Sequence, residues 1–98
     1  MLKVWNMESA SGRKVANQFV ITTGGTYTFQ SYDSTIVSID FANKLIIFYE
    51  CWDYSRTTGK YRNMFLRDYF EALDSKNKVL AAMKAGEVDG FRVVKAWQ

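Results

Sequence analysis

At 98 residues, with 48% hydrophobic and 16% aromatic residues, the chain is long enough for one packed core and too short for two. It has no histidine and a single cysteine, Cys51. This excludes intrachain disulfides, histidine-based catalytic triads and zinc sites built on cysteine and histidine, so we expect no metal and no cofactor. The net charge of +3 comes wholly from residues 51–98 and is weak support for a polyanionic partner.

The first half of the chain has the alternation that is typical of strands. We expect strands over residues 2–6, 15–23, 26–30, 34–41 and 45–50. Gly24 and Gly25 supply the two positive-φ positions of a type I′ hairpin turn, and a second turn is expected over 42–44. The apolar run 45–49 indicates a central strand that is covered on both faces.

Near residue 56 the hydrophobic period becomes helical. Apolar side chains recur at spacings of three and four between residues 61 and 73, which predicts an amphipathic helix. Either Thr57 or Thr58 is expected to cap its start. Three carboxylates follow along the same segment, and we interpret them as a solvated helix face, with a hard-cation site as the alternative: Asp68, Glu71 and Asp74.

A second helix is predicted to begin at Asp74 or Ser75 and to end at Gly86, because glycine suits the left-handed position after a helix. Its inward side chains are expected to be Val79, Leu80 and Met83. Residues 91–97 alternate again. The elements together predict an α+β fold in a single domain, residues 1–98: an antiparallel sheet of four to six strands, two C-terminal-half helices packed on one face, and a closing strand.

Neither a membrane span nor a signal peptide is evident in the sequence. The longest apolar run, residues 45–49, is far shorter than the roughly 20 residues that cross a bilayer. The N-terminus lacks the apolar stretch of a secretory signal. We therefore expect a soluble, cytoplasmic protein with no membrane partner.

The segment 52–67 combines basic and aromatic side chains and has no acidic residue between positions 54 and 67. Cations can follow phosphates while rings stack on unpaired bases, so this composition fits single-stranded nucleic acid. A protein-binding surface is one alternative, and an ordinary structural role as core residues and helix caps is another. The candidate binding residues of the segment are Trp52, Tyr54, Arg56, Lys60, Arg62 and Arg67.

A second basic loop contains Arg13 and Lys14, beside small polar residues that are typical of a surface turn. If this loop lies next to the segment 52–67 in the fold, the two form one basic patch. We include Arg13 and Lys14 among the candidate binding residues on that condition.

Three groups of residues form distinctive motifs: Gly12-Arg13 with Asn17-Gln18-Phe19; Phe29-Gln30-Ser31-Tyr32 with Ser34 and Ile36; and Trp52-Asp53-Tyr54-Ser55 with Thr57-Thr58, Lys60-Tyr61 and Phe65-Leu66. Together they resemble a family of small phage- and mobile-element-encoded proteins of Gram-positive bacteria, a domain of unknown function. The resemblance covers residues 12–66. It brings no catalytic residue with it.

The resemblance implies a non-enzymatic accessory protein that acts by stoichiometric protein binding in the cytoplasm of an infected or lysogenic bacterial host. Its expected partner is a host or phage protein, including a CRISPR nuclease complex, so the first hypothesis is an inhibitor of a host defence system of the anti-CRISPR type. The alternative is a small nucleic-acid-binding regulatory protein that uses the segment 52–67. No residue pair has the spacing of a catalytic site, so we expect no enzymatic activity.

Overall fold

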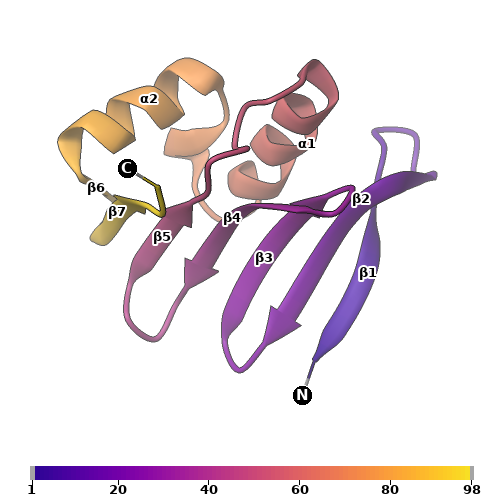
Figure 1. Ribbon diagram of the computed structural model, residues 1–98, viewed down its shortest axis with the longest axis horizontal. Coiled ribbons are helices and arrows are strands. Elements are labelled where there is room, and N and C mark those ends of the chain that lie inside the picture. Colours follow the sequence, from indigo (N-terminus) through magenta and orange to yellow (C-terminus); the bar gives the residue numbers. More distant parts are fainter. Residues whose placement is uncertain (1, 98) are drawn as a thin grey trace.

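A computed structural model describes residues 2–97, and within them seven strands form one sheet in the order β1-β2-β3-β4-β5-β7-β6 (Figure 1). Two α-helices and one short 3₁₀ helix belong to the second half of this described chain, which confirms the α+β fold. The elements are β1 (Lys3–Glu8), β2 (Lys14–Thr23), β3 (Thr26–Ser31), β4 (Ser34–Asp40), β5 (Leu45–Phe48), α1 (Arg56–Arg67), η1 (Glu71–Leu73), α2 (Lys76–Ala85), β6 (Glu87–Val88) and β7 (Phe91–Lys95).

Neighbouring strands pair antiparallel except for β5 and β7, which pair in parallel. The chain leaves β5 and returns as β7 only after both helices, and a parallel pair requires a long crossover of this kind. The closing strand therefore lies beside β5. The sheet exceeds the expected four to six strands because the two-residue strand β6 folds back onto β7 through Asp89 and Gly90.

The predicted turn glycines have the expected backbone conformations. Gly24 (φ 55°) and Gly25 (φ 89°) join β2 to β3 with positive φ at both positions. Ser75 caps α2 by accepting the N–H of Lys78, and Gly86 (φ 80°) ends the same helix in the left-handed conformation. The predicted start and end of this helix are confirmed.

The predicted cap of α1 is wrong, since the Oγ of Ser55 accepts the N–H of Thr58 at 3.1 Å. Ser55 has extended backbone angles (φ −152°, ψ 165°), as a capping residue requires. The threonines at 57 and 58 already lie inside the helix. The true cap, Ser55, lies two residues before Thr57, the first of the two adjacent threonines that the sequence pattern favoured.

Helix α1 also ends earlier than the apolar pattern predicted. Phe70 leaves the helical conformation (φ −142°, ψ 103°), and its ring packs edge-on against Phe91 at 4.9 Å. Consequently Asp68 and Glu71 lie beyond α1, and the expected carboxylate face on one helix is wrong. Among the residues 2–97, no three acidic or sulfur side chains gather as metal ligands would.

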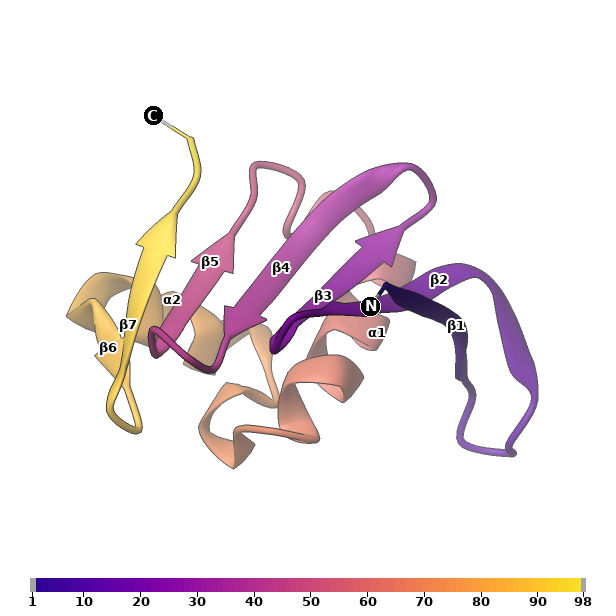
Figure 2. The same ribbon diagram turned by 90° about the horizontal axis from the view of Figure 1, so that it is seen from below.

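Both helices lie on the same side of the sheet (Figure 2). Helix α1 contacts β3, where the rings of Phe29 and Phe65 stack at 6.0 Å, and α2 contacts β6 and β7. Val79 and Ala82 are the buried residues of α2. Leu80, which was expected to point inward, is 43% exposed, because the short helix buries only a narrow face.

Strand β1 lies at the sheet edge opposite the α2 side, beyond the strand that α1 contacts (Figures 1 and 2). This arrangement leaves side chains of β1 and β2 facing α1 across a groove. No helix in the part of the chain from 2 to 97 has the length and hydropathy needed to span a membrane.

Candidate functional site

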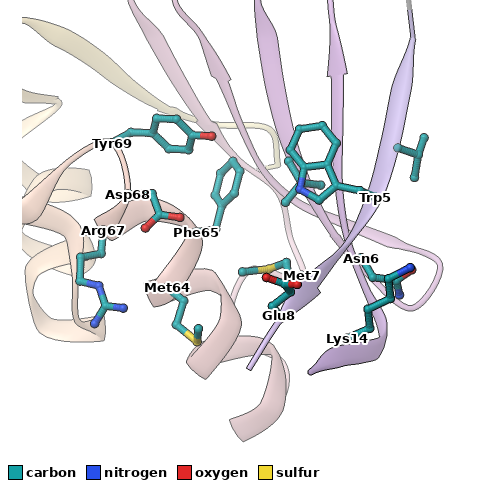
Figure 3. Close-up of a pocket in the computed structure, with 12 residues that line it drawn as sticks. Trp5, Asn6, Met7, Glu8, Lys14, Met64, Phe65, Arg67, Asp68 and Tyr69 are labelled. Atoms are coloured by element: carbon teal, nitrogen blue, oxygen red, sulfur yellow. The ribbon is translucent and has the colours of Figure 1, made fainter. Parts of the chain in front are cut away.

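A groove of about 650 Å³ separates α1 from strands β1 and β2 (Figure 3), and we call it the α1–β1 groove. The buried residues of its lining, Met7, Val20 and Phe65, are apolar and form its floor, and its walls carry aromatic and charged side chains. One wall comes from β1 and β2, and the other from the last turn of α1 and the residues after it. The lining residues are Val4, Trp5, Asn6, Met7, Glu8, Lys14, Val20, Met64, Phe65, Arg67, Asp68 and Tyr69.

Trp5 is directed to the helix side of the sheet by the strand register. It lies opposite Val20, and Val20 lies opposite Phe29, which stacks against α1. Opposed residues in antiparallel strands share one face. No helix residue covers the indole completely, and Trp5 remains 45% exposed at the groove. The groove therefore presents a large aromatic ring to solvent.

Tyr69 supplies the aromatic side chain of the opposite wall (Figure 3). Its ring contacts the rings of Tyr27 at 5.4 Å, Phe65 at 5.5 Å and Phe41 at 5.7 Å, while 37% of the residue stays exposed. Burial raises the pKa of Tyr69 above 10.0, and the nearby Tyr27 and Asp68 raise it further. The hydroxyl therefore stays protonated at neutral pH and can donate a hydrogen bond to a ligand.

Two cations and two carboxylates border the groove, so its charges balance. Lys14 and Glu8 belong to the strand wall, and Arg67 and Asp68 to the helix wall. None of these four forms a salt bridge within residues 2–97. An apolar floor with aromatic walls and a rim of unpaired charges has the composition of a protein-binding surface.

The structure separates the candidate binding residues of segment 52–67 by their exposure, and the most buried of these candidates is Arg62, at 1% exposure. The Arg62 guanidinium donates hydrogen bonds to the carbonyl oxygen of Trp52 at 2.9 Å and to Asp53 Oδ1 at 3.0 Å. Its Nε and Nη2 both donate to Asn63 Oδ1. Arg62 is therefore not a surface cation, and the expectation that it binds a partner is corrected because its donors are engaged inside the protein.

The aromatic residues of the segment also differ in their exposure. Trp52 is half-buried, with its ring against Phe48 at 6.2 Å, and Tyr61 is part of the core. Tyr54 is 48% exposed. Of the rings in this segment, Tyr54 is the one that a ligand reaches most readily.

The remaining cations of the segment share the outer face of α1. Arg56, Lys60 and Arg67 fall within about 40° on the helix circumference, at 100° per residue, and none forms a salt bridge among the described residues. Arg56 and Lys60 line a second hollow of about 510 Å³ together with Lys76 of α2, and we call it the cationic cleft. Arg67 lines the α1–β1 groove instead.

Asp53 lies in the cationic cleft and is already bound by two cations. Its Oδ1 is 3.0 Å from Arg62 Nη1, and its Oδ2 is 2.7 Å from Lys76 Nζ. Partial burial acts to raise the pKa of Asp53, but the hydrogen bonds and positive charges of Lys76 and Arg62 outweigh it and hold the pKa below 3.8. The carboxylate is therefore ionised and neutralised within the fold.

The basic loop next to β2 does not complete a single basic patch. Lys14 lines the groove across from Arg67, with Glu8 and Asp68 in the same lining, so the charges there are mixed. Arg13 is exposed in the loop, where its backbone N–H bonds to Ser9 Oγ at 3.4 Å. The cationic cleft contains neither residue.

Among the site residues that the sequence did not identify, three matter most: Trp5, Tyr69 and Lys76. Tyr69 follows the helical apolar pattern and was assigned to the core, although it follows the end of α1. Lys76 reaches the cleft only through the tertiary packing of α2. The exposure of Trp5 follows from the position of β1 at the sheet edge, which the sequence alone did not show.

Comparison with protein families finds that residues 2–82 match the model of a family of unknown function (DUF8033). The match includes the whole α1–β1 groove and all of the segment 52–67. No curated protein and no solved structure matches the chain.

Proposed function

We propose that this chain, which belongs to the DUF8033 family, is a non-enzymatic module that binds another protein stoichiometrically through the α1–β1 groove. The family brings no activity with it, so this proposal rests on the geometry of the groove. The partner would place an apolar side chain over the floor of the groove, between Trp5 and Tyr69. The charged residues at the rim would pair with polar groups of the partner and set its orientation.

One observation carries this proposal: Trp5 and Tyr69 remain substantially exposed on the two walls of one apolar-floored groove (Figure 3). Tryptophan, tyrosine and arginine dominate the residues whose truncation costs most at protein interfaces, and methionine is enriched there. The groove contains all four types, since Met64 and Arg67 complete its helix wall.

The class of partner is proposed from the sequence motifs. Their resemblance to phage- and mobile-element-encoded proteins supports a partner in the cytoplasm of an infected or lysogenic bacterial host. An inhibitor of a host defence system, such as a CRISPR nuclease complex, fits a small protein that acts by occupying a surface of its target. The net charge of +3 argues against mimicry of DNA.

The test is affinity capture of the tagged protein from a nuclease-treated bacterial lysate, with three forms compared side by side. Wild type and the control Leu80→Ala, which removes an exposed apolar side chain on α2 far from the groove, should retain the same defined partner. Trp5→Ala should reduce retention at least tenfold with an unchanged circular dichroism spectrum. Equal retention by Trp5→Ala and Leu80→Ala would remove the groove from consideration.

A further inference from the structure

The cationic cleft carries a surplus of positive charge that the fold does not use. Four of its lining residues are basic and one is acidic: Arg56, Lys60, Arg62, Lys76 and Asp53. Arg62 and Lys76 both bind Asp53, so that group of three retains one net positive charge. Arg56 and Lys60 add two more, without a salt bridge to any residue from 2 to 97.

These charges continue along α1 in a line. Arg56, Lys60 and Arg67 lie on one face of the helix, over a length of about 16 Å at 1.5 Å per residue. No acidic residue occurs in α1 from its first residue to its last. A row of charges along a helix matches a polymer that carries regularly spaced negative charges better than it matches a single small anion.

Arg56 has no evident structural role in α1. It occupies the first helical position, where the positive end of the helix dipole disfavours a cation. The exposed Tyr54 precedes it by two residues, immediately before the capping Ser55. Tyr54 is not part of the cleft lining, but both of its neighbours in the sequence, Asp53 and Ser55, are. An exposed ring so close in the chain to a row of cations offers the two contacts that single strands need, a stacking surface for a base and charges for the backbone.

We propose that the cationic cleft binds the sugar-phosphate backbone of single-stranded nucleic acid, with Arg56, Lys60 and Lys76 contacting phosphates and Tyr54 stacking on a base. The cleft and the α1–β1 groove share no lining residue, and the nucleic-acid site does not depend on the protein-binding function. If both hold, the protein can contact the protein and the nucleic acid of one nucleoprotein complex at the same time.

The experiment measures fluorescence anisotropy of a labelled oligothymidylate of about 12 nucleotides, within the range of single-strand site sizes, over a series of salt concentrations. Binding of the wild type should weaken with salt, with a slope of about −2 in log K against log salt for three phosphate contacts at about 0.7 each. The double variant Arg56→Gln/Lys60→Gln should lose at least tenfold in affinity, and its slope should fall by about 1.4.

The control Lys84→Gln/Arg92→Gln removes the same net charge from exposed positions on α2 and β7. An equal loss in this control would assign the binding to diffuse charge and overturn the site. Absence of binding at low salt, or binding that does not respond to salt, would also overturn it.

Two competitors test the class of ligand. A duplex of the same length that binds as tightly as the single strand would overturn the preference for unpaired bases. Polyglutamate that displaces the oligonucleotide at equal charge concentration would assign the cleft to acidic proteins instead of nucleic acid. Failure of both competitors, together with weaker binding by Tyr54→Ala, is the result that the proposal expects.

Discussion

The guanidinium of Arg62 lies 5.0 Å from the ring centroid of Trp52, and its Nη1 donates a hydrogen bond to the backbone carbonyl oxygen of the same tryptophan. The two contacts fasten the segment before α1 to the middle of the helix. Asp53 accepts from the same guanidinium and adds the charge that the buried cation requires. Arg62 and Trp52 therefore set the position of α1 and, through it, both surfaces on its flanks.

Removal of the Arg62 side chain should destabilise the protein strongly. Arg62→Ala would remove the donors to the Trp52 carbonyl and to Asp53 Oδ1, while Asp53 Oδ2 keeps Lys76. The loss of a buried, hydrogen-bonded side chain of this size costs about 3–5 kcal/mol. Arg62→Lys should recover little of this loss because an ammonium cannot reproduce the planar fork of donors. Urea denaturation provides the measurement. Arg56→Ala, which removes an exposed arginine on the same helix, should stay within about 0.5 kcal/mol of wild type.

The cap of α1 can be assigned by comparing neighbouring hydroxyl side chains. Ser55→Ala should lower the free energy of unfolding by about 1 kcal/mol, since it removes the acceptor for the Thr58 N–H. Thr57→Ala, at an exposed position inside the helix, should change it by less than about 0.5 kcal/mol. A larger loss for Thr57→Ala than for Ser55→Ala would contradict the observed start of the helix.

The depressed pKa of Asp53 predicts a defined pH dependence of stability. The carboxylate has a pKa below 3.8 in the folded protein and near 3.8 when unfolded, so its stabilising contribution is present above this value. The contribution is lost as the pH falls through the lower, folded-state pKa. The difference in unfolding free energy between wild type and Asp53→Asn should be constant above about pH 5 and shrink below pH 4. A difference that does not change with pH would show that the ion pairs contribute nothing.

Gln18 is fully buried, and neither atom of its side-chain amide has a hydrogen-bond partner within residues 2–97. A buried amide without partners costs roughly 1–3 kcal/mol. Gln18→Met, which keeps the length of the side chain and removes its polar atoms, should therefore raise the free energy of unfolding by about 1 kcal/mol or more. Gln30→Met should lower it, because the Gln30 amide bonds to the Tyr32 carbonyl at 2.7 Å. Destabilisation by both substitutions would contradict this description of Gln18.

Local patterns in the sequence predicted the elements that depend on neighbouring residues. The alternation in residues 15–41 and the Gly24-Gly25 pair correctly predicted the hairpin β2–β3. Ser75 and Gly86 correctly predicted the two ends of α2. The parallel pairing of β5 with β7 was not predictable in this way, because it depends on where the two intervening helices pack. The burial of Arg62 was missed for a similar reason, since its partners are nine and ten residues away.

The sequence motifs that carry the family resemblance lie largely inside the fold. Ser31 and Thr58 join their hydroxyls at 2.9 Å in a buried contact between β3 and α1, and Gln18 lies opposite Ser31 in the sheet. Asn17 (φ 65°) and Tyr32 (φ 56°) adopt left-handed conformations, with the Tyr32 N–H bonded to the Asn17 carbonyl. A distinctive motif therefore pointed to the packing of α1 on the sheet, and the exposed groove beside it carried almost no sequence signal.

Contact between the α1–β1 groove and the partner can be mapped by amide hydrogen exchange of the complex with the captured partner. Because β1 is an edge strand, its outward amides have no strand partner on that side and respond strongly to coverage. We predict that β1 and residues 66–70 gain protection when the partner binds, while α2 and the Gly24-Gly25 turn do not change. Protection confined to α2 and β6, with β1 unaltered, would place the binding surface elsewhere and rule out the groove.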